Sequence, residues 1–161
     1  MALIPSNIEK ILRSRYQKFI DITPSSTVTW KPIGIGITEA NVEYNPQVDT
    51  EKWILEDTAR SDHSSNQKQI SVSQKCYKND PEFEYINSCR DKLNCVSHIL
   101  EVDTWTTENS KYPAKMSDCL ITVTSYSGEE IEYTIYFNGD PTEGGATIAD
   151  GVPTFTATTS L

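Results

Sequence analysis

Residues 131–137 read Ile131-Glu132-Tyr133-Thr134-Ile135-Tyr136-Phe137, and this alternation of apolar and polar residues decides the fold. Its period of two is typical of a β-strand with one buried and one solvated face. The alternation stops at 138–145, where Asn138-Gly139 favours a turn and Pro141 removes a ladder donor. A threonine-rich run over 152–158 then has high β propensity. The pattern predicts two strands joined at 138–145, with edges that are suited to pairing with another chain.

Composition is typical of a soluble globular protein. The chain has 161 residues, 37% of them hydrophobic and 23% charged, and no run approaches the roughly 20 apolar residues of a membrane span. We expect one domain over 1–161, no membrane partner, and no secretory signal, because charged residues such as Glu9 and Lys10 interrupt the first apolar stretch. The net charge of −9 argues against binding nucleic acid by neutralising phosphates. Such a charge fits a protein that repels a polyanion, or one that simply stays soluble.

Four cysteines are present, at Cys76, Cys89, Cys95 and Cys119, and none belongs to a Cys-x-x-Cys pair. Zinc sites and thioredoxin-like redox sites therefore lack their usual local geometry. The even count permits two disulfides, but a reducing compartment favours free thiols. Without an export signal, we predict four free thiols and interpret Cys119 as a small apolar residue within a strand.

Signals for catalysis are weak. The two histidines, His63 and His98, show no metal-ligand spacing with other residues. A nucleophile pair of Cys95 and His98 would be badly oriented, because residues three apart on a strand point to opposite faces. The carboxylates around Glu130 fit a charged turn and a solvated strand face more simply than an acid–base pair. We predict no catalytic residue, no metal and no cofactor.

One helix has a clear start. Asp80 is suited to the N-cap, Pro81 to the first turn, and the glutamates that follow it to the positive end of the helix dipole. Phe83, Ile86 and Leu93 share one helical face. The pattern predicts a helix near 81–94 that flanks the sheet.

A second helical signal lies near the N-terminus. Ser6 and Glu9 match a capping box, and the apolar residues from Ile8 to Phe19 fall close to one helical face. We predict a short helix or helix-like arm over 7–19, within an N-terminal region 1–27. Its basic residues are the solvated side of that helix, or a patch that docks on an acidic neighbouring copy.

Alternation also predicts strands at 28–33, 37–44, 67–75, 97–105 and 117–126. The strands at 37–44 and 67–75 each have one polar face, which carries Glu39, Asn41, Glu43, Gln69, Ser71 and Ser73. The stretch 45–66 between them is long for a compact domain, and such excursions are usually functional or disordered. Its Trp53-Ile54-Leu55 cluster favours a hairpin whose tip contacts a partner.

The order of these segments resembles the major tail tube proteins of long-tailed bacteriophages, of the non-contractile, siphovirus type. Three parts of the sequence carry the resemblance. They are Lys31-Pro32-Ile33-Gly34-Ile35-Gly36-Ile37-Thr38-Glu39 leading into 42–47, Lys52-Trp53-Ile54 followed by the helix from Asn79 to Ile86, and Tyr136-Phe137-Asn138-Gly139-Asp140-Pro141 followed by Pro153-Thr154-Phe155.

The resemblance implies a mainly β subunit, a β-sandwich or half-barrel with one flanking helix. Six copies would form a ring, and rings would stack into the hollow tail of a virion, assembled in the cytoplasm of the host bacterium. The implied partners are other copies of this chain, the tape measure protein, and tail tip or terminator proteins. DNA would pass through the lumen without specific binding.

The resemblance also assigns roles to segments. The polar set Glu39, Asn41, Glu43, Gln69, Ser71 and Ser73 would face the lumen, where acidic and neutral groups let DNA slide. Trp53, Ile54 and Leu55 would anchor the arm 45–66 to the adjacent ring. The C-terminal strand or arm, 152–161, would pair with a neighbour.

Three alternatives remain open at this point. The first is a monomeric β-sandwich module that binds carbohydrate or acts as an adhesin, with Trp30, Trp53 and Trp105 on a ligand surface. The second is a small hydrolase whose site the sequence does not reveal. The third, within the structural class, is a tube protein of a contractile tail or a tail-like bacteriocin.

Overall fold

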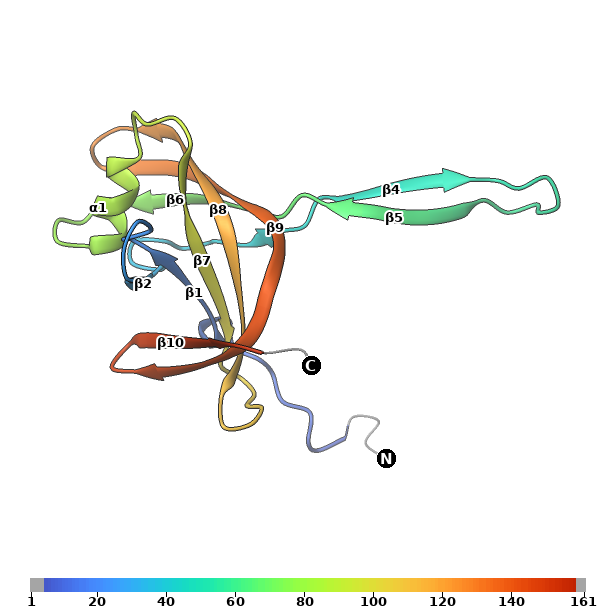
Figure 1. The fold of residues 1–161 in the computed structure, drawn as a ribbon, viewed down its shortest axis with the longest axis horizontal. Coiled ribbons are helices and arrows are strands. Elements are labelled where there is room, and N and C mark those ends of the chain that lie inside the picture. The colour runs from blue at the N-terminus through green and yellow to red at the C-terminus, as the bar shows by residue number, and fades with distance from the viewer. Residues whose placement is uncertain (1–4, 159–161) are drawn as a thin grey trace.

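The computed structural model describes residues 5–158, which form a mainly β structure with one α-helix (Figure 1). The main sheet has eight strands in the order β2-β1-β7-β8-β9-β6-β3, with β10 paired to β9, and all pairings are antiparallel. Strands β4 and β5 form a separate two-stranded sheet. No helix within 5–158 is long and apolar enough to span a membrane.

The elements are a 3₁₀ helix at Arg13–Arg15, β1 at Tyr16–Asp21, β2 at Trp30–Pro32, β3 at Val42–Glu43, β4 at Pro46–Glu51, β5 at Arg60–Asn66, β6 at Gln69–Lys75, α1 at Pro81–Ser88, β7 at Cys95–Asp103, β8 at Tyr112–Tyr126, β9 at Glu130–Ala149 and β10 at Val152–Ala157. The β-rich class and the single flanking helix confirm the fold class expected from the sequence.

The described residues form two hydrophobic cores, one on each side of β7. Ile99 belongs to the core beneath α1, whereas Leu100 belongs to a second core, because adjacent strand residues point to opposite faces. The first core also contains Ile86 of α1 and the buried residues of β6 and of the first half of β9. The second core lies where the β9–β10 hairpin curls back towards β1 and β2 (Figure 1). It contains Phe19, Trp30, Leu100, Val102, Ala114 and Ala146.

The break predicted at 138–145 is not a turn between two strands, because β9 continues through it to Ala149. Asp118 pairs with Asn138 and Met116 with Thr142, so an irregularity in the ladder absorbs the extra residues. Gly139 adopts a positive φ of 73° there, which fits a bulge as well as it fits a turn. The hairpin turn is at Asp150-Gly151, where both residues have positive φ.

The C-terminal strand is present as β10, but it pairs with β9 of the same chain, from Val152 opposite Ala149 to Ala157 opposite Gly144. A Cβ atom at Gly144 would lie 2.2 Å from the carbonyl oxygen of Thr156, so only glycine fits this close approach. The remainder of the expected arm, 159–161, lies outside the described residues, as do residues 1–4 of the expected N-terminal region.

The helix predicted over 7–19 is wrong. Residues 7–12 are not helical, Arg13–Arg15 form one 3₁₀ turn, and the chain then enters β1. Residues 16–20 form a strand because they pair with β7, with Phe19 opposite Leu100 and Ile20 opposite Ile99. A strand lets these adjacent apolar residues enter different cores, which a helix would not allow, so tertiary packing overrides the local capping signal.

Helix α1 begins as predicted but ends earlier. The Asp80 carboxylate accepts a hydrogen bond from the Glu82 amide at 3.2 Å, as an N-cap does. The helix stops at Ser88, and Leu93 is 93% exposed instead of packing on the sheet. The chain has to turn back into β7 at Cys95, and Asn94 takes a positive φ of 55° to do so.

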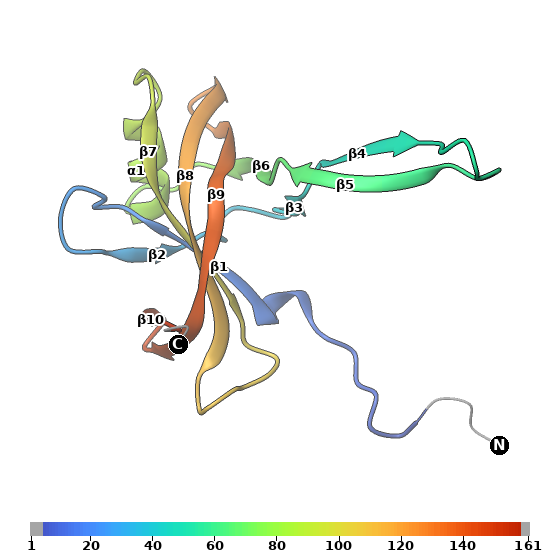
Figure 2. The same cartoon turned by 45° about the vertical axis from the view of Figure 1, so that its right-hand side comes forward.

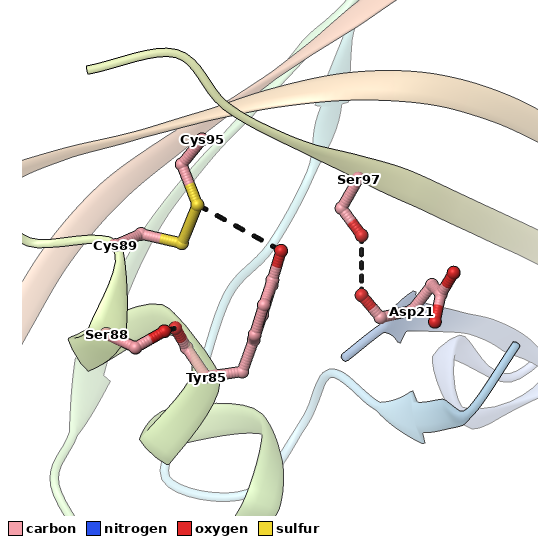
Figure 3. Close-up of a disulfide and its surroundings, with 6 residues drawn as sticks. All are labelled: Asp21, Tyr85, Ser88, Cys89, Cys95 and Ser97. Carbon is pink, nitrogen blue, oxygen red and sulfur yellow. Dashed lines mark hydrogen bonds between the residues drawn. A yellow bond between two sulfur atoms is a disulfide. The ribbon is translucent and has the colours of Figure 1, made fainter. Parts of the chain in front are cut away.

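Cys89 and Cys95 form a disulfide across this turn, which corrects the prediction of four free thiols (Figure 3). The end of α1 and the start of β7 bring the two Cα atoms to 5.8 Å, a separation that a disulfide requires. The tertiary fold brings the two cysteines together, whereas their spacing of six residues in the sequence does not predict a disulfide. Cys76 and Cys119 are free thiols, and Cys119 is buried in β8 as expected.

A buried polar cluster fastens α1 to the sheet. Glu82 is 1% exposed, accepts a hydrogen bond from the Tyr133 hydroxyl at 2.8 Å and accepts another from the Gln74 amide at 2.8 Å. Gln74 also donates to the Ile35 carbonyl at 2.9 Å, so the cluster holds the segment that follows β2 as well. Burial raises the pKa of Glu82 from 4.5 to about 7, although its hydrogen bonds from Tyr133 and Gln74 oppose the rise.

We expect the cluster to make the subunit less stable as pH rises. The pKa of Glu82 is higher in the folded protein than in the unfolded chain, so its stabilising contribution is complete below about pH 4.5 and is lost as pH rises through about 7. The loss is of the order of 3 kcal/mol at most. Urea unfolding of wild type and Glu82→Gln at pH 5 and pH 8 measures it. The free energy of unfolding should fall less between these pH values in the variant, and equal falls would contradict the assignment.

Candidate assembly surfaces

Strands β4 and β5 form a hairpin that projects away from the body of the subunit (Figures 1 and 2). The pairing runs from Pro46 opposite Asn66 to Glu51 opposite Arg60, with an irregularity at Gln47/Val48. Every residue of both strands is exposed. The hairpin expected within 45–66 is therefore confirmed, and we call residues 45–66 the arm.

The end of the arm presents apolar side chains to solvent. Ile54 is 100% exposed and Leu55 is 95% exposed. Trp53 is 51% exposed and is held by its own hairpin, because its indole N–H donates to Glu51 at 2.6 Å and the Arg60 guanidinium lies 4.1 Å from its ring centroid. Ile54 and Leu55 have no such support. They form an apolar tip on an arm whose strands are mostly polar.

A second surface is the polar side of the sheet on β3, β6, β8 and β9. Along β6 the residues alternate strictly, with Ile70 and Val72 buried and Ser71 and Ser73 exposed. Register extends this face sideways, because Ser71 lies opposite Thr134, which in turn lies opposite Thr122. We call the set the open sheet face. Its members are Glu43, Gln69, Ser71, Ser73, Thr122, Thr124, Glu132 and Thr134.

The structure brings four of the six predicted face residues together. Glu43 pairs with Gln69, so both lie on the same side of the sheet as Ser71 and Ser73. Sequence reasoning did not assign Thr122, Thr124, Glu132 and Thr134 to this face, although the alternation at 131–137 already separated Glu132 and Thr134 from the buried residues.

Glu39 and Asn41 are exposed but belong to no strand, so they are not on the open sheet face. Only Val42–Glu43 of the predicted strand 37–44 pairs with β6, apart from a single bridge between Ile37 and Gln74. The chain has to cross from β2 to the far edge of the sheet here, which leaves too few residues for a long strand. The Asn41 side chain donates to Glu39 at 2.6 Å, a local contact of the connection.

The tryptophans do not line one ligand surface. Trp30 is 7% exposed and belongs to the second core, Trp53 lies near the tip of the arm, and Trp105 lies in the connection between β7 and β8. The sugar-binding arrangement considered from the sequence is therefore wrong for these residues.

The pair of Cys95 and His98 is also excluded as a nucleophile and base. Cys95 is held in the disulfide, and His98 Nδ1 lies 3.1 Å from the carboxylate of buried Asp21. Asp21 in turn accepts hydrogen bonds from the backbone amides of Thr23 and Thr29, so this group holds the loop between β1 and β2 in place. Across residues 5–158, no three His, Cys, Asp or Glu side chains gather as a metal site would require.

Comparison with known proteins gives no family for the chain: neither the family models nor the curated proteins contain a match.

We expect the arm tip to contribute nothing to the stability of the isolated subunit. Replacing Ile54 and Leu55 with serine should change the free energy of unfolding by less than about 0.5 kcal/mol, because neither side chain is buried. Ile135→Ala is the contrasting variant, since Ile135 is fully buried and its truncation should cost about 2–5 kcal/mol. Urea unfolding measures both. A large loss in the tip variant would mean that the tip packs against its own subunit.

Proposed function

We propose that this chain is the structural subunit of a bacteriophage tail tube of the non-contractile type. Copies form rings of six, and rings stack into a hollow conduit for DNA. The observation that carries the proposal is the arm, a fully exposed hairpin that places Ile54 and Leu55 away from the body of its own subunit (Figure 2).

The arm supports a head-to-tail assembly. In the proposed tube, its tip meets a different surface on the next copy in a repeating head-to-tail order, and heterologous contacts of this kind generate rings or open stacks. Burial of two aliphatic side chains and part of Trp53 gives the contact an apolar centre, and the polar flanks of the arm would form its rim. In the proposed tube, Trp53, Ile54 and Leu55 contact the adjacent ring.

The open sheet face supports the role of a conduit. Its members are serine, threonine, glutamine and two glutamates, Glu43 and Glu132. On the same side of the sheet, Lys75 of β6 lies opposite Glu130 of β9. Carboxylates therefore outnumber cations on this side of the sheet, and they repel DNA phosphates. In the proposed tube this face lines the lumen, so DNA passes without being held.

The proposal places the protein in the virion tail, after assembly in the cytoplasm of the host bacterium. Its partners are other copies of the chain, a tape measure protein inside the tube, and tail tip and terminator proteins at the two ends. It needs no catalytic residue and no cofactor.

Negative-stain electron microscopy over a concentration series tests the proposal. Wild type should form rings or hollow tubes, and Ile54→Ser with Leu55→Ser should form no tubes, because the contact between rings loses its apolar centre. Leu93→Ser is the matched control: Leu93 is as exposed as the tip residues but lies in the connection between α1 and β7. Loss of tubes in this control but not in the tip variant would contradict the role of the arm.

A second test adds positive charge to the open sheet face. We expect tubes of Ser71→Lys with Ser73→Lys to retain DNA that wild-type tubes release, because six copies would line each ring of the lumen with cations. DNA co-sedimentation at low and high salt measures this retention. Ser25→Lys with Ser26→Lys is the control, since it adds the same charge on the exposed loop between β1 and β2. Equal retention by both variants would argue against a lumen formed by this face.

A further inference from the structure

The root of the arm contains a buried ion pair. Lys68, two residues after β5, places its Nζ atom 2.7 Å from Glu101 Oε2 on β7, and the two side chains are 14% and 7% exposed. The other carboxylate oxygen of Glu101 accepts a hydrogen bond from the hydroxyl of Tyr16 on β1. The segment that directly follows the arm is thus tied at Lys68 to β7 and, through Glu101, to β1.

Aromatic rings hold the same ammonium group. Lys68 Nζ lies 4.6 Å from the ring centroid of Phe137 on β9 and 5.2 Å from that of Tyr44. Tyr44 directly precedes the arm, so both chain ends of the arm contact one charge. Backbone hydrogen bonds complete this root, since the Gln67 amide donates to the Tyr44 carbonyl and the Phe137 amide donates to the Lys68 carbonyl, both at 2.9 Å.

The conformation of this root determines the direction in which the arm points. Every residue of β4 and β5 is exposed, and the two strands pair with each other and with no other strand. Nine residues at about 3.3 Å each place the tip about 30 Å from the root. A rotation of about 15° at the root therefore displaces the tip by about 8 Å, which is more than the width of a side-chain contact.

We propose that Lys68 and Glu101 are positioning residues that fix the angle of the arm relative to the sheet. A buried ion pair is a poor device for stability alone, because desolvation of both charges opposes their attraction. It is suited to directing the arm, because the ammonium has to meet the carboxylate and both rings in one orientation. The consequence for assembly rests on the proposed function, but the consequence for arm direction concerns the isolated subunit.

Distances between spin labels in the full-length monomer test this proposal. One label is attached at Ile54→Cys on the tip and one at Glu129→Cys in the turn between β8 and β9, in a background with Cys76→Ser and Cys119→Ala. Wild type should give a narrow distance distribution. The double variant Lys68→Met with Glu101→Gln leaves no unpaired buried charge and should broaden the distribution about twofold or more, at unchanged circular dichroism.

The matched control is Lys115→Met with Glu143→Gln, which removes an exposed ion pair of the same type. It should leave the distribution narrow. If the double variant at the root does not fold, the distance distribution of Tyr44→Ala is measured in its place. Tyr44 is half-exposed, so this substitution removes one of the two rings without opening a cavity in a core. A distribution as narrow as wild type in the folded root variant overturns the proposal, whether or not the protein forms tubes.

Discussion

Pairing between β8 and β9 is the interaction on which the rest of the structure depends. The two strands pair from Tyr112 opposite Ala146 to Tyr126 opposite Ile131, with an irregularity near Ser117. On one side of that irregularity the ribbon covers the core beneath α1, and on the other it carries β10 over the second core. Because β6 also pairs with the first half of β9, the open sheet face exists only while this ladder is intact.

The same ladder separates the buried side of the sheet from its exposed side. Side chains that point towards α1 fill the first core. The other side of β6, β8 and β9 is mostly polar, with Leu120 and Tyr136 as apolar exceptions. The arm leaves this sheet between β3 and β6, so the apolar tip and the open sheet face are held at a fixed relation by the root at Lys68. In the proposed tube, the apolar tip would contact the next ring and the open sheet face would line the lumen.

Sequence reasoning succeeded where the signal is local. Alternation around Ile70 and Ile135 requires only neighbouring residues, and so does the N-cap at Asp80. The arm could also be anticipated, because a long polar stretch that contains Trp53 has no place inside a compact sheet. In each case the residues that decide the conformation lie within a few positions of one another.

Sequence reasoning failed where residues far apart in the chain determine the local conformation. Residues 16–20 are a strand because residues 99–103 pair with them, a contact that no capping signal near Ser6 can reveal. The Asn138-Gly139 step marks a bulge because β8 continues alongside it, and the same dipeptide would serve equally well as a turn. Lys68 and Glu101 are separated by 33 residues, so their ion pair, and with it the root of the arm, follows only from the completed sheet.

Cryo-electron microscopy of the assembled protein tests the central claim most directly, since a reconstruction locates both surfaces at once. The account predicts a hollow tube in which Ser71 and Ser73 line the lumen and Ile54 and Leu55 are buried against the next ring. An assembly in which another subunit covers the open sheet face while the arm tips remain in solvent would contradict it.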